Sequence, residues 1–236
     1  MVLVLSTFLI LLKILEGRIL NIIDNFNIEL ENDEILRLLQ NKSSQDKSRN
    51  APSSLLDDIE EMKKEALPLI QPRAIYDIFT SEELEPRFLF KKSEMTILAI
   101  STIGNKLESL SKAFLKKGNL AQGVILDAIA SHAAEQAAEY INQEILKEIA
   151  EKIEGKDITS RFSPGYCQWE LDKGQRTIFD ILDSSKIGVS LTQSMMMNPV
   201  KSVSFAINIG TDVDKELGIR GCENCDMINC TYRRIK

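Results

Sequence analysis

Apolar residues recur every three or four positions through the middle of the chain, a spacing typical of amphipathic helices. The longest such segment extends from Gln122 to Glu154, and Gly155 follows it as a stop signal. Its middle, Ala128 to Ala138, is rich in alanine, so either a sheet or a flat ligand can approach the helix axis closely. Shorter helices are predicted after a cap at Asn32, from Ser54 to Pro68, from Ile103 to Lys117 and from Thr177 to Asp183.

Short apolar or β-branched runs that are bounded by polar residues predict strands. In the last of them, Val203, Phe205 and Ile207 alternate with Ser202 and Ser204, so one face should belong to the core. Together with the helices, the strands predict an α+β fold, in which a twisted, mostly antiparallel sheet packs against the long scaffold helix and flanking helices. The predicted strands are Arg18 to Ile23, Arg73 to Phe79, Arg87 to Phe90, Met95 to Ser101 and Ser202 to Ile209.

Changes in composition divide the chain into three parts. Residues 1–16 form a strongly apolar extension, but Ser6 and Thr7 interrupt the run well short of the roughly 20 residues that span a bilayer. A core domain is expected over 17–210, and within it 41–54 has the polar composition of a flexible loop. Residues 211–236 form a tail that contains cysteines. We therefore expect one domain, no signal peptide and no membrane association.

The overall composition is that of a globular protein that can bury a sizeable core, because 44% of the 236 residues are hydrophobic. The 29 basic and 35 acidic residues give a formal net charge of −6. Such a chain lacks the broad cationic field that binding to nucleic-acid phosphates requires. The composition therefore argues against nucleic acid and favours a protein partner or a small ligand.

The segment Arg161-Phe-Ser-Pro-Gly-Tyr166 combines three residue types that suit a small zwitterionic ligand. A guanidinium holds a carboxylate through two parallel hydrogen bonds, a glycine lets backbone approach the ligand closely, and a tyrosine offers a ring face and a hydroxyl. Taken alone, these residues also fit a turn with a surface arginine and a half-buried tyrosine. The motifs that follow the segment favour the ligand interpretation.

Three further motifs come after the arginine segment in a fixed order: Leu191 to Ser194, Met197 to Pro199 and Ser202 to Ser204. Together with a preceding alanine-rich helix, Asp127 to Tyr140, this set resembles the activation domain of cobalamin-dependent methionine synthase. The resemblance covers roughly 120–210, whereas the last 26 residues depart from the methionine synthase form. It implies an activation-domain-like fold that binds S-adenosylmethionine.

The resemblance also assigns roles to individual residues. It implies that Arg161 holds the amino-acid end of S-adenosylmethionine, while Gly165 and Tyr166 shape the same loop. Glu135 falls on a ligand position of the scaffold helix. As an alternative, Glu135 is a solvated carboxylate that pairs with a lysine and contributes little.

Other polar residues of the scaffold helix support this site less directly. Asp127 and Ser131 precede Glu135 at intervals of four residues, so they share its helix side and would assist it from behind. His132 is the only histidine, and its surroundings differ from the Asp-x-His-x-x-Gly signature with which many corrinoid proteins ligate cobalt. We therefore interpret His132 as an ordinary helix residue and expect a partner to present cobalamin.

By this resemblance the chain is a stand-alone reactivation module. It would bind S-adenosylmethionine and support reductive methylation of cob(II)alamin on a cobalamin-dependent methionine synthase or other corrinoid methyltransferase, with an electron from a flavodoxin- or ferredoxin-type donor. The alternative is a non-catalytic module that grips a corrinoid protein or a metal on the same fold. Met195 to Met197 either fill the core, which we favour, or face a corrin ring or a partner.

The tail carries an independent signal, because Cys222, Cys225 and Cys230 lie within nine residues. A C-x-x-C pair directs two sulfurs to one centre, and the third thiol would make a three-thiolate site for zinc or an iron–sulfur cluster. Cys167 or an outside group would supply a fourth ligand. The alternative is reduced or redox-active thiols, because the cytoplasmic location that we expect disfavours structural disulfides.

Overall fold

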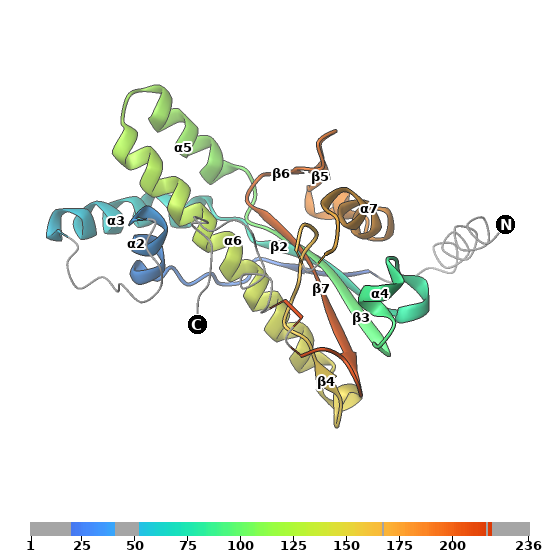
Figure 1. The fold of residues 1–236 in the computed structure, drawn as a ribbon. Helices are drawn as coiled ribbons and strands as arrows, with labels where there is room; N and C mark the ends of the chain where they lie inside the picture. The colour runs from blue at the N-terminus through green and yellow to red at the C-terminus, as the bar shows by residue number, and fades with distance from the viewer. Residues whose placement is uncertain (1–19, 41–51, 167, 216, 219–236) are drawn as a thin grey trace.

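The computed structural model describes residues 20–40, 52–166, 168–215 and 217–218, so the apolar extension 1–16 lies outside it. Its centre is a five-stranded sheet in the order β1-β2-β3-β7-β4, in which every neighbouring pair is antiparallel. Helices pack on both faces of this sheet (Figure 1), which confirms the predicted α+β class. The strands are β1 (Asn21–Asp24), β2 (Arg73–Thr80), β3 (Met95–Thr102), β4 (Asp157–Ile158) and β7 (Ser202–Gly210).

The long helix α6 (Leu120–Glu148) crosses one face of the sheet and is the scaffold that the sequence predicts (Figure 1). A short 3₁₀ turn (Ala150–Ile153) follows it, so the α-helix ends before the predicted Glu154. The same face carries α2 (Asn32–Gln40), α3 (Ser53–Ala66) and α5 (Lys106–Lys116). The opposite face carries α4 (Arg87–Phe90) and α7 (Leu171–Ile181).

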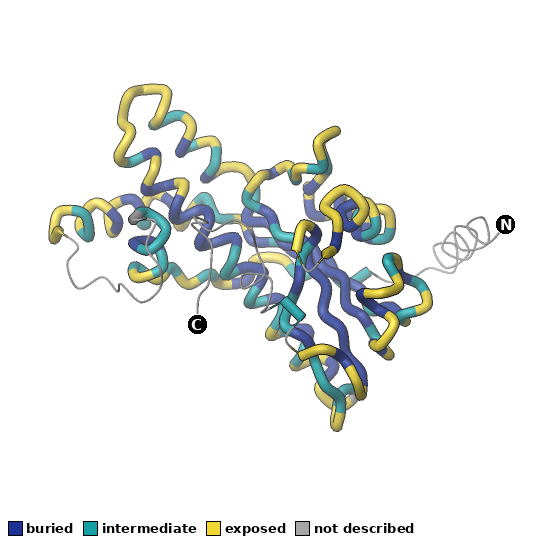
Figure 2. The backbone as a smooth tube through the Cα atoms, viewed as in Figure 1, coloured by how far each residue is buried: buried dark blue, intermediate teal, exposed yellow. Residues whose placement is uncertain are grey.

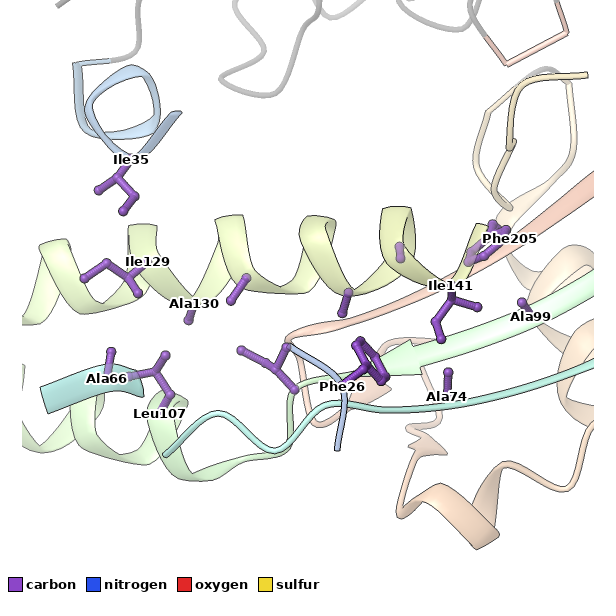
Figure 3. Close-up of a cluster of buried hydrophobic side chains, with 14 of the residues drawn as sticks. Phe26, Ile35, Ala66, Ala74, Ala99, Leu107, Ile129, Ala130, Ile141 and Phe205 are labelled. Carbon is purple, nitrogen blue, oxygen red and sulfur yellow. The ribbon is translucent and has the colours of Figure 1, made fainter. Parts of the chain in front are cut away.

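Small side chains let α6 lie close to the sheet and to the neighbouring helices. Ala130, Ala133 and Ala137 are fully buried in its alanine-rich middle. Figure 3 shows Ile141 of α6 between the helix and the strands that carry Ala74 and Ala99. Burial of apolar surface is the dominant stabilising term in folding, and close approach leaves few voids in it. The alanine-rich segment therefore serves tight packing.

The two cores of the protein meet at β7. Phe205, Ile207 and Ile209 belong to the core beneath α6, whereas Ala206 belongs to the core on the α7 side. The sequence predicted one buried face for this strand, but both faces are buried, because helices cover the sheet on either side (Figure 2). Sequence alternation could not reveal this, because its second face consists of serines, an alanine and an asparagine.

The predicted strand from Arg87 to Phe90 is wrong, because these residues form helix α4. Aromatic residues favour strands in general, but here packing decides the conformation. Phe90 is fully buried and contacts the edge of Trp169, with ring centroids 5.5 Å apart. Helix α7 also begins earlier than predicted, at Leu171 and not at Thr177.

The prediction that Met195 to Met197 fill the core is wrong for Met196, whereas Met197 packs against the core on the α7 side. Strands β5 (Ser190–Leu191) and β6 (Met197–Asn198) form a separate two-stranded sheet, and the methionines lie in and after the turn between them. Met196 is 51% exposed, and the other two are half-buried. A two-stranded ribbon has no second layer over its turn, which explains why Met196 remains at the surface.

Candidate functional site

Polar residues form a line along α6 because they recur every four positions, about one helical turn. The line is about 18 Å long at the usual rise of an α-helix. Two basic residues from the edge of the sheet contact it: Lys201 meets the first two members, and Arg161 meets the last two. We call this arrangement the α6 polar line, and its members are Asp127, Ser131, Glu135 and Glu139.

Arg161 is placed by the segment that follows β4. Its neighbour Phe162 forms a bridge with Ala206 of β7 through two backbone hydrogen bonds of 3.0 and 2.8 Å. Successive residues of extended chain point to opposite sides, and Phe162 packs into the core on the α7 side. The side chain of Arg161 therefore points to the other side, toward α6.

The guanidinium of Arg161 contacts two carboxylates and one aromatic ring. Its Nη2 donates to Glu135 at 2.8 Å, and its Nε donates to Glu139 at 3.3 Å. It also lies over the ring of Phe205, 5.7 Å from the centroid, within the range of a cation–π contact. The arginine side chain is 15% exposed, whereas each glutamate is 41% exposed. The guanidinium is therefore largely buried against the Phe205 ring, while the two carboxylates that pair with it remain accessible to solvent.

Lys201 immediately precedes β7 and contacts the other end of the α6 polar line. Its ammonium lies 2.8 Å from the Asp127 carboxylate and donates to the Ser131 hydroxyl at 2.8 Å. The four-residue step from Lys201 to Phe205 spans about 13 Å of strand, and the eight-residue step along α6 between the two contact pairs spans about 12 Å. Helix and strand therefore run alongside each other in the same direction, with a cation at each end of the shared stretch.

The loop after Arg161 contains the two other residues of the sequence motif. Gly165 donates its N–H to the carbonyl of Trp169 at 2.7 Å and has a φ of 91°, a left-handed conformation that favours glycine. Trp169 is buried, whereas Tyr166 is 48% exposed. The loop is therefore anchored from inside while its tyrosine remains accessible.

The structure thus brings Arg161 and Glu135 into direct contact. Sequence analysis missed Glu139 and Lys201. The position of Glu139, four residues after Glu135, was a signal that could have found it. Nothing local to Lys201 indicates that it lies beside α6, because that contact depends on the register of β7 against the helix.

His132 is buried, and its Nε2 accepts a hydrogen bond of 3.0 Å from the backbone N–H of Glu31. It has a structural contact, as expected of an ordinary helix residue. The predicted metal ligands Cys222, Cys225 and Cys230 lie outside the described residues, as does Cys167.

Within the ranges that the structure describes, no three His, Cys, Asp or Glu side chains are grouped to hold a metal ion. None of the helices in those ranges combines the length and the apolar character that crossing a bilayer requires.

Gly174 of α7 lies where any side chain would collide with the Arg161 loop. A Cβ at this position would stand 2.7 Å from Cβ of Pro164 and 2.9 Å from Cε2 of Trp169, and both partners are rigid rings. We expect Gly174→Ala to displace the loop and to lower the free energy of unfolding by about 1–3 kcal/mol, as measured by urea denaturation. Arg176→Ala, at an exposed site on the same helix, should change it by less than about 0.5 kcal/mol. An unchanged midpoint for Gly174→Ala would show that the loop does not depend on this contact.

Comparison with known proteins agrees with the fold and the motifs. The family model "Vitamin B12 dependent methionine synthase, activation domain" matches residues 86–216. A crystal structure of the MetH reactivation domain bound to AdoHcy matches with a TM-score of 0.64 and 16% sequence identity, over 83% of this chain and 79% of that chain. No match was found among curated proteins. Because the family model covers more than half of the 236 residues, the chain belongs to the family of vitamin B12 dependent methionine synthase activation domains.

Proposed function

We propose that this activation domain binds S-adenosylmethionine at Arg161 and supports the reductive methylation of cob(II)alamin. The observation that carries the proposal is the guanidinium of Arg161, held by Glu135 and Glu139 inside the Arg-x-x-x-Gly-Tyr motif. A MetH domain of the same fold was solved with AdoHcy, the demethylated form of this ligand, and its binding supports the proposal.

The geometry of Arg161 suits the carboxylate of the ligand. A guanidinium has five N–H donors, and the bonds to Glu135 and Glu139 use one on Nε and one on Nη2. The N–H groups on Nη1, with the second on Nη2, form the edge that accepts a carboxylate through two parallel bonds. Because two side chains and the Phe205 ring already fix the guanidinium, little rotamer freedom is lost when the ligand binds.

The charges of the site also match the ligand. Among the described side chains of the site, the guanidinium of Arg161 and the carboxylates of Glu135 and Glu139 have a summed charge of −1. S-adenosylmethionine carries one carboxylate, one ammonium and one sulfonium, so its net charge is +1. The half-exposed carboxylates of Glu135 and Glu139 can attract the two cations of the ligand while Arg161 holds its anion. Gly165 would allow the backbone to approach, and Tyr166 would offer its exposed ring to the adenosyl group.

We propose that cobalamin reaches this site on a cobalamin-dependent methionine synthase or another corrinoid protein. The only histidine, His132, is occupied by the backbone of Glu31 and lacks the cobalt-ligating signature. One electron from a flavodoxin- or ferredoxin-type donor reduces Co(II) to Co(I). The methyl group then moves from the sulfonium to cobalt: the C–S bond breaks, a Co–C bond forms, and AdoHcy leaves. This chain would bind and orient the methyl donor, and the partner would supply the metal.

Replacement of Arg161 tests the ligand site. We expect Arg161→Ala to weaken S-adenosylmethionine binding about 10–100-fold in calorimetry, because a charge-assisted, bidentate contact is lost. Arg161→Lys keeps the charge without the planar fork and should give an intermediate loss. Arg176→Ala, on the exposed side of α7, serves as the control. Undiminished binding by a folded Arg161→Ala protein, or no binding by the unmodified protein, would reject the proposed site.

Replacement of Glu135 tests the charge argument. Glu135→Gln keeps an acceptor for Arg161 but removes one negative charge. Because Glu135 is half exposed, we expect a loss of about 3–10-fold in affinity for S-adenosylmethionine, and less than about twofold for AdoHcy, which lacks the sulfonium charge. Glu144→Gln, which removes a charge from a surface pair with Lys147 on the same helix, should change neither affinity. Equal losses for the two ligands would contradict an electrostatic role for Glu135.

We also propose that Cys222, Cys225 and Cys230 bind zinc or an iron–sulfur cluster, with Cys167 or an outside group as the fourth ligand. The proposal is supported by the C-x-x-C spacing of Cys222 and Cys225, which directs two sulfurs to one centre. Anaerobically purified protein should contain zinc or iron by elemental analysis, and Cys225→Ser should lose it. Protein that contains neither metal would refute this second proposal alone.

A further inference from the structure

The hairpin that α5 and α6 form ends in an apolar tip. Leu115, Leu120 and Val124 at this tip are between 38% and 63% exposed (Figure 2). The two helices are joined tightly there, because Gly123 leaves no room for a side chain of its own beside Leu115, and its carbonyl accepts a hydrogen bond of 2.8 Å from the Ser111 hydroxyl. The hairpin is therefore a firmly packed arm whose apolar end faces solvent.

The same tip is positively charged. Lys116 and Lys117 are exposed at the end of α5, and neither forms an ion pair with a described residue. No acidic residue occurs over 109–126, although the whole chain has 35 acidic residues and a formal net charge of −6. An apolar centre with a charged rim is typical of a protein interface, and here the cations favour an acidic partner.

An acidic surface lies on α3 of the same chain. Asp57, Glu61 and Glu65 recur every four residues and Asp58 adjoins them, so these carboxylates share one side of the helix. All four are exposed, and none forms an ion pair with a residue that the structure describes. Like charges four residues apart destabilise a helix, so a cationic partner would relieve their repulsion. Leu67, which follows α3 and is 49% exposed, adds an apolar contact at its end.

Within one copy, these two surfaces lie apart. The end of α3 and the beginning of α5 are packed into one core beneath α6, where Ala66 and Leu107 are fully buried (Figure 3). From this point, α3 and the hairpin extend in different directions (Figure 1). The free carboxylates of α3 and the free lysines of the tip can therefore pair only between molecules.

We infer that the tip of the α5–α6 hairpin docks on α3 of a second copy of this chain. Around a twofold axis the second copy returns the same contact, so lysines meet carboxylates at two places in one dimer. Exposed ion pairs are individually weak, so the apolar residues of the tip and Leu67 supply affinity while the charges select the partner surface. Val124 lies about 17 Å along α6 from Glu135, so this interface is separate from the proposed ligand site.

Sedimentation velocity on the full chain tests this inference. We expect a dimer at about 20 mM NaCl and a dissociation constant about tenfold or more higher at about 500 mM, because salt screens exposed charges. Lys116→Glu with Lys117→Glu should weaken association about tenfold or more. Lys147→Glu with Lys173→Glu is the matched control, because it makes the same change in net charge at exposed ion pairs elsewhere, and it should alter association less than about twofold. A monomer at every protein and salt concentration, or equal weakening by both variants, would overturn the inference.

An exchange of charges between the two surfaces tests the pairing directly. Asp57→Lys with Glu61→Lys should also weaken self-association, because lysines of α3 would then face lysines of the tip. Mixed with the Lys116→Glu and Lys117→Glu protein, this variant should form a one-to-one dimer, since opposite charges then meet at both contacts. Two folded variants that fail to associate when mixed would exclude the proposed pairing. A monomer that co-sediments with phosphatidylserine vesicles would assign the basic tip to a membrane surface and would equally reject the dimer.

Discussion

The proposed ligand site depends on the contact between Arg161 and the two glutamates of α6. It joins the scaffold helix to the edge of the sheet, and it orients the only cation of the sequence motif. Its contribution to stability should be small, because both carboxylates are 41% exposed and such pairs are weakened by water and salt. An arrangement that stabilises the fold little but fixes a planar donor accurately is more useful for recognition than for folding.

The fold can support this contact because α6 and β7 run alongside each other for at least two turns of the helix. The apolar sides of both elements are buried in one core, so their relative positions are fixed by packing and not by the ion pairs. Small residues on α6 keep the helix close enough to the sheet for the side chains of Arg161 and Lys201 to reach it. The α6 polar line is thus a consequence of core packing, which a change in a single surface charge would leave in place.

The sequence predicted these elements well where periodicity and local chemistry agree, as in α6, β2, β3 and β7. It failed at Arg87 to Phe90, where aromatic residues favour a strand but burial of Phe90 against Trp169 requires a helical turn. The family resemblance also pointed to Arg161 and Glu135, which the structure brings together. Lys201 could not be found in this way, since its partners are defined by the register between distant elements.

The motif itself can be understood as a way of ending a strand. Phe162 keeps the chain paired to β7, which directs Arg161 toward α6. Two residues later Pro164 removes the donor that would have continued the ladder, and Gly165 then turns the chain with a φ of 91°. The same few residues therefore supply the cation and end the pairing of this segment with β7.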